Sequence, residues 1–375
     1  MKILCTKENL SLALSLISGI TSKNVNLPIL NNVLIKVENQ KVELITTNLE
    51  LAITTQLRSQ IEEEGSFTVP AKTLYDFVNL LSDEKVELSV KENELEVRCG
   101  KSATKIKGST SEEFPVLPTV EEGDGFLLSS DEFKKGLDKV IQAAAKHDIR
   151  PELAGVLFDF NEYNEGQLTM AATDSYRLAE KKLKLNQGKE KKRLIVPART
   201  AQEINRVLAL VKNSESSEQS TRLVVTDNQI VVRCSDVELI SRLVAGKYPD
   251  YTQIIPKEFK TTAILPVNKT VKEVKAASLF TTTGVNAVSL TVLPEKGMVG
   301  LSSASAQAGE HKSEIVSEIE GGENSILLNH RYVLDGLGNM EDEECELKIV
   351  NKDNPCLFKP KEDKSYLYIV MPIRQ

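Results

Sequence analysis

The acidic and histidine residues that could catalyse a reaction are scattered through this sequence of 375 residues. The densest acidic cluster, residues 341–344, falls where a helix should give way to a strand, so we interpret it as solvated charge rather than a metal site. Asp174 has no histidine or second carboxylate beside it, and His147 and His330 each stand alone, although general acid–base chemistry needs such groups within reach of one another. The sequence contains no phosphate-binding glycine loop, zinc-protease motif or nucleophile elbow. It therefore predicts no catalytic residue, no metal ion and no cofactor, and offers binding surfaces instead.

Composition indicates a folded protein that does not cross a membrane. Apolar residues make up 41% and charged residues 27% of the chain, and no segment approaches the roughly 18 uncharged apolar residues of a membrane span. The apolar segment 10–20 resembles a signal-peptide core, but charged residues precede it and no clean cleavage site ends it, so we expect a buried amphipathic helix. The five cysteines lie far apart and lack metal-ligand spacing, which predicts reduced, buried thiols in a cytoplasmic protein.

Three copies of one pattern occur along the chain. Residues 66–81, SFTVPAKTLYDFVNLL, align with residues 193–208, RLIVPARTAQEINRVL, at an offset of 127 residues. The third copy, LLNHRYVLDGL at 327–337, keeps a base and an acid four residues apart, 259 residues beyond the first copy. These base and acid pairs are Lys72 and Asp76, Arg199 and Glu203, and Arg331 and Asp335. A nearly constant period predicts repeated structural units.

The segments around these copies repeat in the same order. VELSVKENELEVRC at 86–99 aligns with TRLVVTDNQIVVRC at 221–234, and ELKIVNKDNPCLF at 346–358 supplies the third copy. Each repeat then ends in an element that contains proline: EEFPVLP, GKYPDYTQIIP and YIVMPIRQ. Near the start of the first two repeats, LPILNNVLIKV aligns with RPELAGVLFDF, and ITTNLELA with ATDSYRLA. An ordered series of this kind is not a chance match.

Each repeat combines helical and strand patterns. Apolar spacing predicts helices at 7–19, 71–81, 131–146, 198–212, 268–279 and 330–339. Alternating runs rich in β-branched residues, such as 42–46, 86–90 and 230–233, predict strands. The order helix, strands, helix, strands predicts an α+β fold in which two helices cover one face of an antiparallel sheet. We expect three such domains at 1–120, 126–256 and 260–375, with linkers at 121–125 and 256–262 and a surface loop at 212–221.

Charge is divided unevenly between the predicted helices and the rest of the chain. The chain carries −7, but the six helices together carry +5, which leaves −12 on the remainder. Lysines gather on one side of two helices: Lys135, Lys139 and Lys146 on one, and Lys269, Lys272 and Lys275 on the other. A basic helical surface on an acidic protein suits a phosphate backbone. Solvated helix faces with internal ion pairs, Lys72 with Asp76 and Arg331 with Asp335, are the alternative interpretation.

Together these motifs resemble the DNA polymerase III β subunits of bacteria, a family of replicative sliding clamps. The resemblance covers essentially the whole chain, from MKILCTKENL and FTVPAK through ATDSYRLA and KYPDY to VMPIRQ. It implies three clamp-type domains per subunit, and a head-to-tail homodimer that forms a ring of six domains. Helices would line a hole around double-stranded DNA, which accounts for their basic charge. The implied function is a non-catalytic processivity factor of the replicative polymerase.

The resemblance also implies which residues contact DNA. The corresponding positions are Lys23, Asn24, Lys72, His147, Arg150 and Arg199. A ring that slides must hold DNA without reading its sequence, and contacts to phosphates have this property. The chain departs from the family pattern where Asn24 replaces a base, and where Pro151 and Glu152 follow the arginine that aromatic residues follow in some members.

A partner-binding pocket is implied between the second and third domains. It would receive a short peptide with a Gln and two terminal apolar residues, which the polymerase catalytic subunit, the clamp loader and repair proteins share. Apolar walls with a flexible methionine suit varied peptides. The implied pocket residues are Leu153, Thr173, Asp174, Ser175, Tyr176, Arg177, Leu178, Pro249, Ile254, Ile369, Met371, Pro372 and Ile373. Taken alone, Ile369 and Met371 would also fit an ordinary core tail.

The implied head-to-tail interface sets the edge near Thr104 and Ile106 of the first domain against Leu279 and its helix in the third domain. Two other classes of protein fit the residues without the resemblance. One is a nucleic-acid-processing enzyme with its active site in an interdomain cleft, and the other is a repeat scaffold that binds proteins but not DNA.

Overall fold

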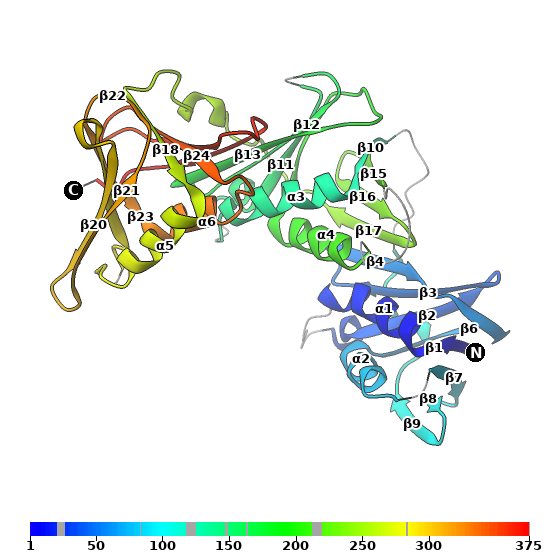
Figure 1. The fold of residues 1–375 in the computed structure, drawn as a ribbon. Helices are drawn as coiled ribbons and strands as arrows, with labels where there is room; N and C mark the ends of the chain where they lie inside the picture. The colour runs from blue at the N-terminus through cyan, green and yellow to red at the C-terminus, as the bar shows by residue number, and fades with distance from the viewer. Residues whose placement is uncertain are drawn as a thin grey trace. The chain divides into compact units, whose positions relative to one another are not determined.

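The chain forms two compact units in a computed structural model that describes residues 1–20, 27–82, 84–117, 125–146, 149–162, 164–211, 220–282 and 284–374. Unit 1 consists of residues 1–134, 185–188 and 199–243, and unit 2 of residues 135–184, 189–198 and 244–375 (Figure 1). Within the described ranges, no helix is long and apolar enough to span a membrane.

Unit 1 contains two antiparallel sheets. Its strands are β1 (Lys2–Thr6), β2 (Asn32–Glu38), β3 (Lys41–Thr47), β4 (Leu51–Gln56), β5 (Ser59–Glu63), β6 (Gly65–Pro70), β7 (Lys85–Lys91), β8 (Glu94–Cys99), β9 (Ser102–Lys107), β10 (Phe126–Ser129), β15 (Ser220–Val225), β16 (Gln229–Cys234) and β17 (Val237–Arg242). The strand orders are β5-β1-β7-β8-β9 and β10-β15-β16-β17-β4-β3-β2-β6. Its helices are α1 (Lys7–Ile17), α2 (Ala71–Asn79) and α4 (Ala198–Val211). Helix α3 (Ser130–Val140) begins in unit 1 and ends in unit 2.

Unit 2 also contains two antiparallel sheets. Its strands are β11 (Gly155–Phe160), β12 (Gln167–Thr173), β13 (Arg177–Lys184), β14 (Lys192–Pro197), β18 (Thr261–Pro266), β19 (Ala287–Leu293), β20 (Met298–Ser305), β21 (Gly309–Val316), β22 (Ile319–Gly321), β23 (Asn324–Asn329), β24 (Glu344–Ile349), β25 (Cys356–Pro360) and β26 (Tyr366–Val370). The strand orders are β14-β11-β12-β13-β26-β25-β24-β18-β22 and β21-β20-β19-β23. Helices α5 (Val267–Ser278) and α6 (His330–Leu337) complete the unit.

Two strand pairs join successive repeats. In unit 1, β4 of the first repeat pairs with β17 of the second, with Ile53 opposite Leu239. In unit 2, β13 of the second repeat pairs with β26 of the third, with Leu178 opposite Ile369. Because each pair continues a sheet across a repeat boundary, three sequence repeats produce two compact units.

The helices form where apolar residues recur at helical spacing. In α1, Leu10, Leu14 and Ile17 are fully buried, and the Thr6 hydroxyl accepts a hydrogen bond from the Asn9 N–H at 3.2 Å and so caps the first turn. The pattern repeats in the other helices, so each repeat contributes two helices and antiparallel strands, as the sequence predicted. Five of the six predicted helices and the three predicted strands end within two residues of the observed bounds.

Two predicted boundaries are wrong. The helix predicted at 131–146 ends at Val140 and continues as one 3-10 turn, η4 (Ile141–Ala143), because the Ala145 N–H bonds to the Leu153 carbonyl at 2.9 Å and the backbone leaves the helix. The linker predicted at 256–262 ends earlier, since Thr261 already begins β18. The predicted linker 121–125 and loop 212–221 lie mostly outside the described residues.

Candidate partner pocket and DNA-contacting residues

The turn 173–177, which connects β12 to β13, contains five predicted pocket residues, and its own side chains fix its shape. Asp174 Oδ1 accepts hydrogen bonds from the backbone N–H groups of Tyr176 and Arg177, both at 3.0 Å. Thr173 Oγ1 accepts from the Ser175 N–H at 3.1 Å and donates to the Arg177 carbonyl at 2.6 Å. Ser175 has a φ of 76° in the left-handed region, which such side-chain bonds stabilise. The turn thereby presents Tyr176 to solvent, 63% exposed.

Arg177 is the last residue of this turn, and its side chain bonds to three other groups of unit 2. Its side chain is 4% exposed, and Nε donates to Asp174 Oδ2 at 3.0 Å. Nη1 donates to the Asp335 carboxylate of α6, and Nη2 donates to the Gln142 carbonyl. The guanidinium also lies over the Tyr332 ring, 4.6 Å from its centroid. These contacts fix the Arg177 side chain, and through it the position of the turn.

An apolar cluster lies below the turn in unit 2. Leu153, Leu178 and Ile369, three of the predicted pocket residues, belong to it. The remaining buried members are Leu157, Ala171, Ile195, Tyr248, Tyr251 and Leu357. The structure therefore brings together residues from five segments that are separate in the sequence.

Two tyrosines of this cluster lie on either side of Pro249, and neither was among the predicted pocket residues. Tyr248 and Tyr251 pack edge to face with ring centroids 6.4 Å apart, and the Tyr251 hydroxyl donates to Glu180 at 2.6 Å. Burial raises the pKa of the Tyr248 hydroxyl, which stays protonated. Both tyrosines belong to the KYPDY motif, which is the sequence signal that could have identified them. Ile254 closes the 3-10 turn η6 (Tyr251–Ile254) and is 39% exposed.

The C-terminal tail continues from β26 past the turn. The Met371 N–H donates to the Tyr176 carbonyl at 2.8 Å, so the tail is fixed to the exposed part of the turn. Met371 and Pro372 are half-buried beside it. The Ile373 N–H donates to the Leu327 carbonyl at 2.8 Å, and its side chain borders a separate hollow of about 500 Å³.

Three of the predicted DNA-contacting residues lie in the described ranges. Lys72 and Arg199 are the exposed second residues of α2 and α4. The N-terminal end of a helix dipole is positive, so the dipole does not favour a cation at either position. Lys72 pairs with Asp76 at 2.8 Å, as the sequence predicted, and Arg150 pairs with Glu152 at 3.0 Å. Exposed pairs of this kind are weak, so a phosphate can compete for the cation. The predicted contacts Lys23, Asn24 and His147 lie outside the described residues.

The basic surface predicted on 131–146 is wrong for Lys139. This residue is 5% exposed, its Nζ lies 2.9 Å from Asp363 Oδ2, and it lies over the Tyr366 ring at 5.3 Å. Lys181 contacts the same carboxylate oxygen at 2.7 Å. Lys139 therefore neutralises a partly buried acid and is not available to DNA.

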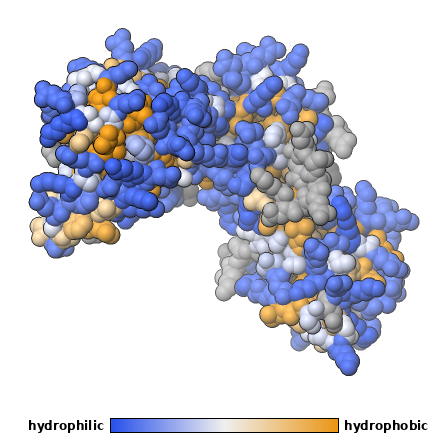
Figure 2. All heavy atoms as spheres, viewed as in Figure 1, coloured by the Kyte–Doolittle hydropathy of each residue, from blue (hydrophilic) through white to orange (hydrophobic). Residues whose placement is uncertain are grey.

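Other charges match the prediction in part. On α5, Lys269, Lys272 and Lys275 are exposed, while Val274 and Ala277 are fully buried. The predicted pair of Arg331 with Asp335 is not among the ion pairs of the described residues, because Asp335 binds Arg177. Figure 2 shows hydrophilic residues over most of the visible surface, interrupted by small apolar patches.

The residues predicted for the dimer interface lie on an edge strand and a helix end. Strand β9 is the last strand of its sheet, with Thr104 half-buried and Ile106 only 6% exposed. Leu279 follows the last residue of α5 and is 73% exposed. The edge strand thus offers backbone groups more than side chains, whereas Leu279 offers an apolar side chain.

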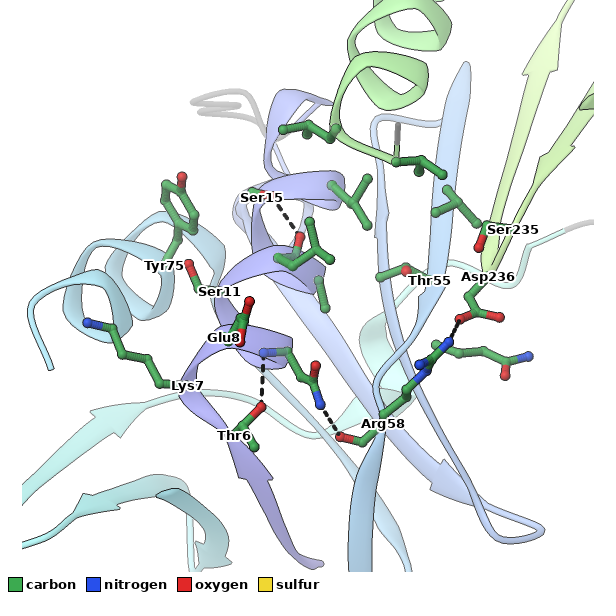
Figure 3. Close-up of a pocket in the computed structure, with 18 of the residues that line it drawn as sticks. Thr6, Lys7, Glu8, Ser11, Ser15, Thr55, Arg58, Tyr75, Ser235 and Asp236 are labelled. Carbon is green, nitrogen blue, oxygen red and sulfur yellow. Dashed lines mark hydrogen bonds and ion pairs between the residues drawn. The ribbon is translucent and has the colours of Figure 1, made fainter. Parts of the chain in front are cut away.

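Unit 1 also contains a hollow of about 1360 Å³ that no sequence motif indicated (Figure 3). Residues from α1, α2, β4 and β17 line it, with Thr6, Ser11 and Tyr75 among them. An exposed ion pair at 3.4 Å joins Arg58 and Asp236 at its side. Within the described part of the chain, no group of acidic, histidine or cysteine residues there or elsewhere could hold a metal ion.

Known proteins resemble this chain over almost its full length. Residues 1–118, 127–250 and 252–374 match the N-terminal, central and C-terminal domains of the DNA polymerase III beta subunit family. A curated relative named "Beta sliding clamp", from Staphylococcus epidermidis, is 28% identical over 363 residues, 94% of each chain. The crystal structure of the Bacillus subtilis DNA polymerase sliding clamp has a TM-score of 0.92 at 26% identity, covering 100% of this chain and 99% of that one. A Pseudomonas aeruginosa sliding clamp bound to griselimycin has a TM-score of 0.92 at 25% identity, covering both chains completely.

The repeated domains, the family matches and the similar structures together define a sliding clamp. A sliding clamp is a non-catalytic processivity factor of DNA replication. The chain belongs to the DNA polymerase III beta subunit family. Proteins of this family bind DNA and the polymerase. The clamp function is thus supported over the enzyme and scaffold alternatives.

Proposed function

We propose that two copies of this chain close head to tail into a ring of six clamp domains, with limits near 1–120, 126–256 and 260–375 in each copy, and that the ring encircles duplex DNA. Strands β9 and β21 support this proposal because each lies at the edge of its sheet. An edge strand has free backbone groups ready to pair with another chain. Thr104 and Ile106 lie on β9, and Leu279 directly follows α5, the helix that packs on β21.

The DNA contacts in this proposal are electrostatic and independent of sequence. Lys72, Arg150 and Arg199 would hold phosphates, together with Lys23, Asn24 and His147. The exposure of the first three residues, and the weak pairs of Lys72 and Arg150, suit contacts that exchange quickly as the ring slides.

The partner pocket in this proposal lies in unit 2, around the β12–β13 turn. The observation that carries it is the hydrogen bond from the Met371 N–H to the Tyr176 carbonyl, because it joins the C-terminal tail to the turn above the apolar cluster. Leu153, Leu178, Pro249 and Ile254 complete the wall. Short peptides of the polymerase catalytic subunit, the clamp loader and repair proteins would bind here. The cytoplasm is the proposed location, and the burial of all five cysteines as thiols agrees with it.

Small-angle X-ray scattering with mass calibration tests the ring. We expect a mass near 83 kDa, twice 41.5 kDa, and a distance distribution with the depleted short distances of a hollow particle. A compact particle of 41.5 kDa at micromolar concentration would contradict the proposal. Retention on nicked circular DNA, compared with loss after linearisation, then tests whether the ring encloses the duplex.

A further inference from the structure

The turn 47–51, which connects β3 to β4 in unit 1, has the same hydrogen bonds as the turn of the candidate pocket. Thr47 Oγ1 accepts from the Leu49 N–H at 3.0 Å and donates to the Leu51 carbonyl at 3.1 Å. Asn48 Oδ1 accepts from the N–H groups of Glu50 and Leu51 at 3.0 and 2.8 Å. The four equivalent bonds shape the turn 173–177 in unit 2.

The bond that joins the pocket turn to the next strand is also repeated. In unit 1, the N–H of Arg242, at the end of β17, donates to the Glu50 carbonyl at 2.9 Å. In unit 2, the Met371 N–H donates to the Tyr176 carbonyl at 2.8 Å. Arg242 and Glu50 of unit 1 therefore occupy the positions that Met371 and Tyr176 occupy in the candidate pocket.

An apolar row lies beside the turn 47–51, as it does beside the pocket turn. Ile240 of β17 lies opposite Ala52 of β4 and Val231 of β16, and Val224 of β15 lies opposite Val231. Three of these four residues form a buried cluster. The corresponding row of unit 2 belongs to the cluster below the pocket turn and consists of Leu178, Ile369 and Leu357. Arg242 is two residues from Ile240 on the same strand, so it shares the face of this row.

Leu49 is strained and exposed within this turn. Its φ of 77° matches the 76° of Ser175, and it is the one apolar residue among the described non-glycine residues with a positive φ. A leucine is disfavoured in the left-handed region, and 46% of this one remains exposed. The turn does not require a leucine, because Ser175 forms the same turn in unit 2. An apolar side chain kept under strain at the surface indicates a binding role.

We propose that the turn 47–51 and the end of β17 form a second peptide-binding site, for a short peptide in which apolar residues stand between an acid and a base. The apolar residues pack on Leu49, the acid pairs with Arg242, and the base pairs with Glu50. Both charged side chains are exposed. The site therefore selects a different peptide from the candidate pocket, where Met371 and Tyr176 suit apolar residues. The inference rests on the proposed pocket, because it takes the frame of that pocket as its template.

Fluorescence anisotropy with the full chain tests whether the site exists. The probe is a fluorescein-labelled peptide with a Leu-Phe pair between an Asp and a Lys. We expect it to bind, and to stay bound in excess unlabelled peptide that contains a Gln and two terminal apolar residues. Displacement by that competitor would overturn the inference, because it would place the probe in the pocket of unit 2. A probe that does not bind would also overturn it, while binding of the labelled competitor would show that the proposed pocket stands.

Two variants test which residues hold the probe. Leu49→Ser should weaken binding about tenfold, since it removes an apolar contact and installs the residue that already has this φ in unit 2. Leu12→Ser, at a leucine of α1 that is 38% exposed, is the matched control. Arg242→Glu should weaken the probe about fivefold and favour a second probe in which Lys replaces the Asp. Leu49→Ser affinity equal to that of the control, or an equal effect of Arg242→Glu on both probes, would overturn the inference.

Discussion

Asp335 of α6 accepts a hydrogen bond from Arg177 of the β12–β13 turn, although its sequence places a base, Arg331, one helical turn before it. In the first repeat, the equivalent acid Asp76 pairs with the equivalent base Lys72 at 2.8 Å. In the third repeat, Asp335 therefore binds the turn of the candidate pocket instead of the base on its own helix. Helix α6 thereby supports the turn that presents Tyr176.

Asp335→Asn is expected to weaken binding of a clamp-binding peptide about threefold to tenfold, because a charge-assisted hydrogen bond of ~1 kcal/mol no longer holds Arg177 and the turn. Fluorescence anisotropy with a labelled peptide, containing a Gln and two terminal apolar residues, measures the effect. Glu341→Gln removes the same charge from a side chain that is 64% exposed and is the control. Equal affinity in the two variants would show that α6 does not shape the turn.

Met371→Ala is expected to weaken binding of the same peptide at least about tenfold, because the pocket wall loses roughly 1.5 kcal/mol of apolar burial. The thermal unfolding midpoint should change little, because Met371 is half-buried at the end of the chain. Val316→Ala, at a residue 67% exposed in the same unit, is the matched control. Wild-type affinity in the Met371 variant would remove the tail from the pocket.

Lys72→Glu and Arg199→Glu are expected to shorten the lifetime of the ring on nicked circular DNA while leaving the oligomer mass unchanged. Each phosphate contact that is lost should lower the slope of log affinity against log salt by about 1. Gel filtration after loading, at several salt concentrations, gives both quantities. Lys257→Glu alters an exposed lysine outside the helices and should retain DNA normally. A salt slope unchanged from the wild type would contradict the assigned contacts.

Local pattern was sufficient to predict most of the fold. The six helices and their repeat order follow from apolar spacing, because each helix buries a stripe whatever lies beyond it. Helix ends were less predictable: α3 stops at Val140 because Ala145 pairs with Leu153. That competing backbone bond has no local sequence signal.

The candidate site was predictable only where its residues are contiguous or carry a motif. The turn 173–177 stood out as one segment, and Tyr248 and Tyr251 could have been assigned from KYPDY. The burial of Lys139 and the bond from Arg177 to α6 were not predictable, because Asp363 and Asp335 lie 224 and 158 residues away from them in the sequence. Only the tertiary structure shows which cation is buried and which is free.

Asp363 joins the second repeat to the third within unit 2. Its Oδ2 lies 2.9 Å from Lys139 Nζ and 2.7 Å from Lys181 Nζ, and its Oδ1 accepts hydrogen bonds from Ser365. Burial alone would raise the pKa of this carboxyl, but the hydrogen bonds from Lys181, Ser365 and Lys139 outweigh burial and hold the pKa well below its ordinary value. The charged form is therefore more stable in the folded protein than in the unfolded chain.

A depressed folded-state pKa makes the stability from Asp363 fully present above the unfolded pKa of about 3.9 and lost as the pH falls below it. Asp363→Asn is expected to lower the free energy of unfolding of unit 2 by about 3 kcal/mol at pH 7, because two buried lysines lose their counterion. At pH 2.5 the wild type has itself begun to lose this stabilisation, so the difference in free energy of unfolding between wild type and variant should be smaller than at pH 7. Urea midpoints at both pH values measure it, with Asp353→Asn, at an exposed residue, as the control. A gap of equal size at both pH values would show that the stabilisation does not come from the ionised carboxylate.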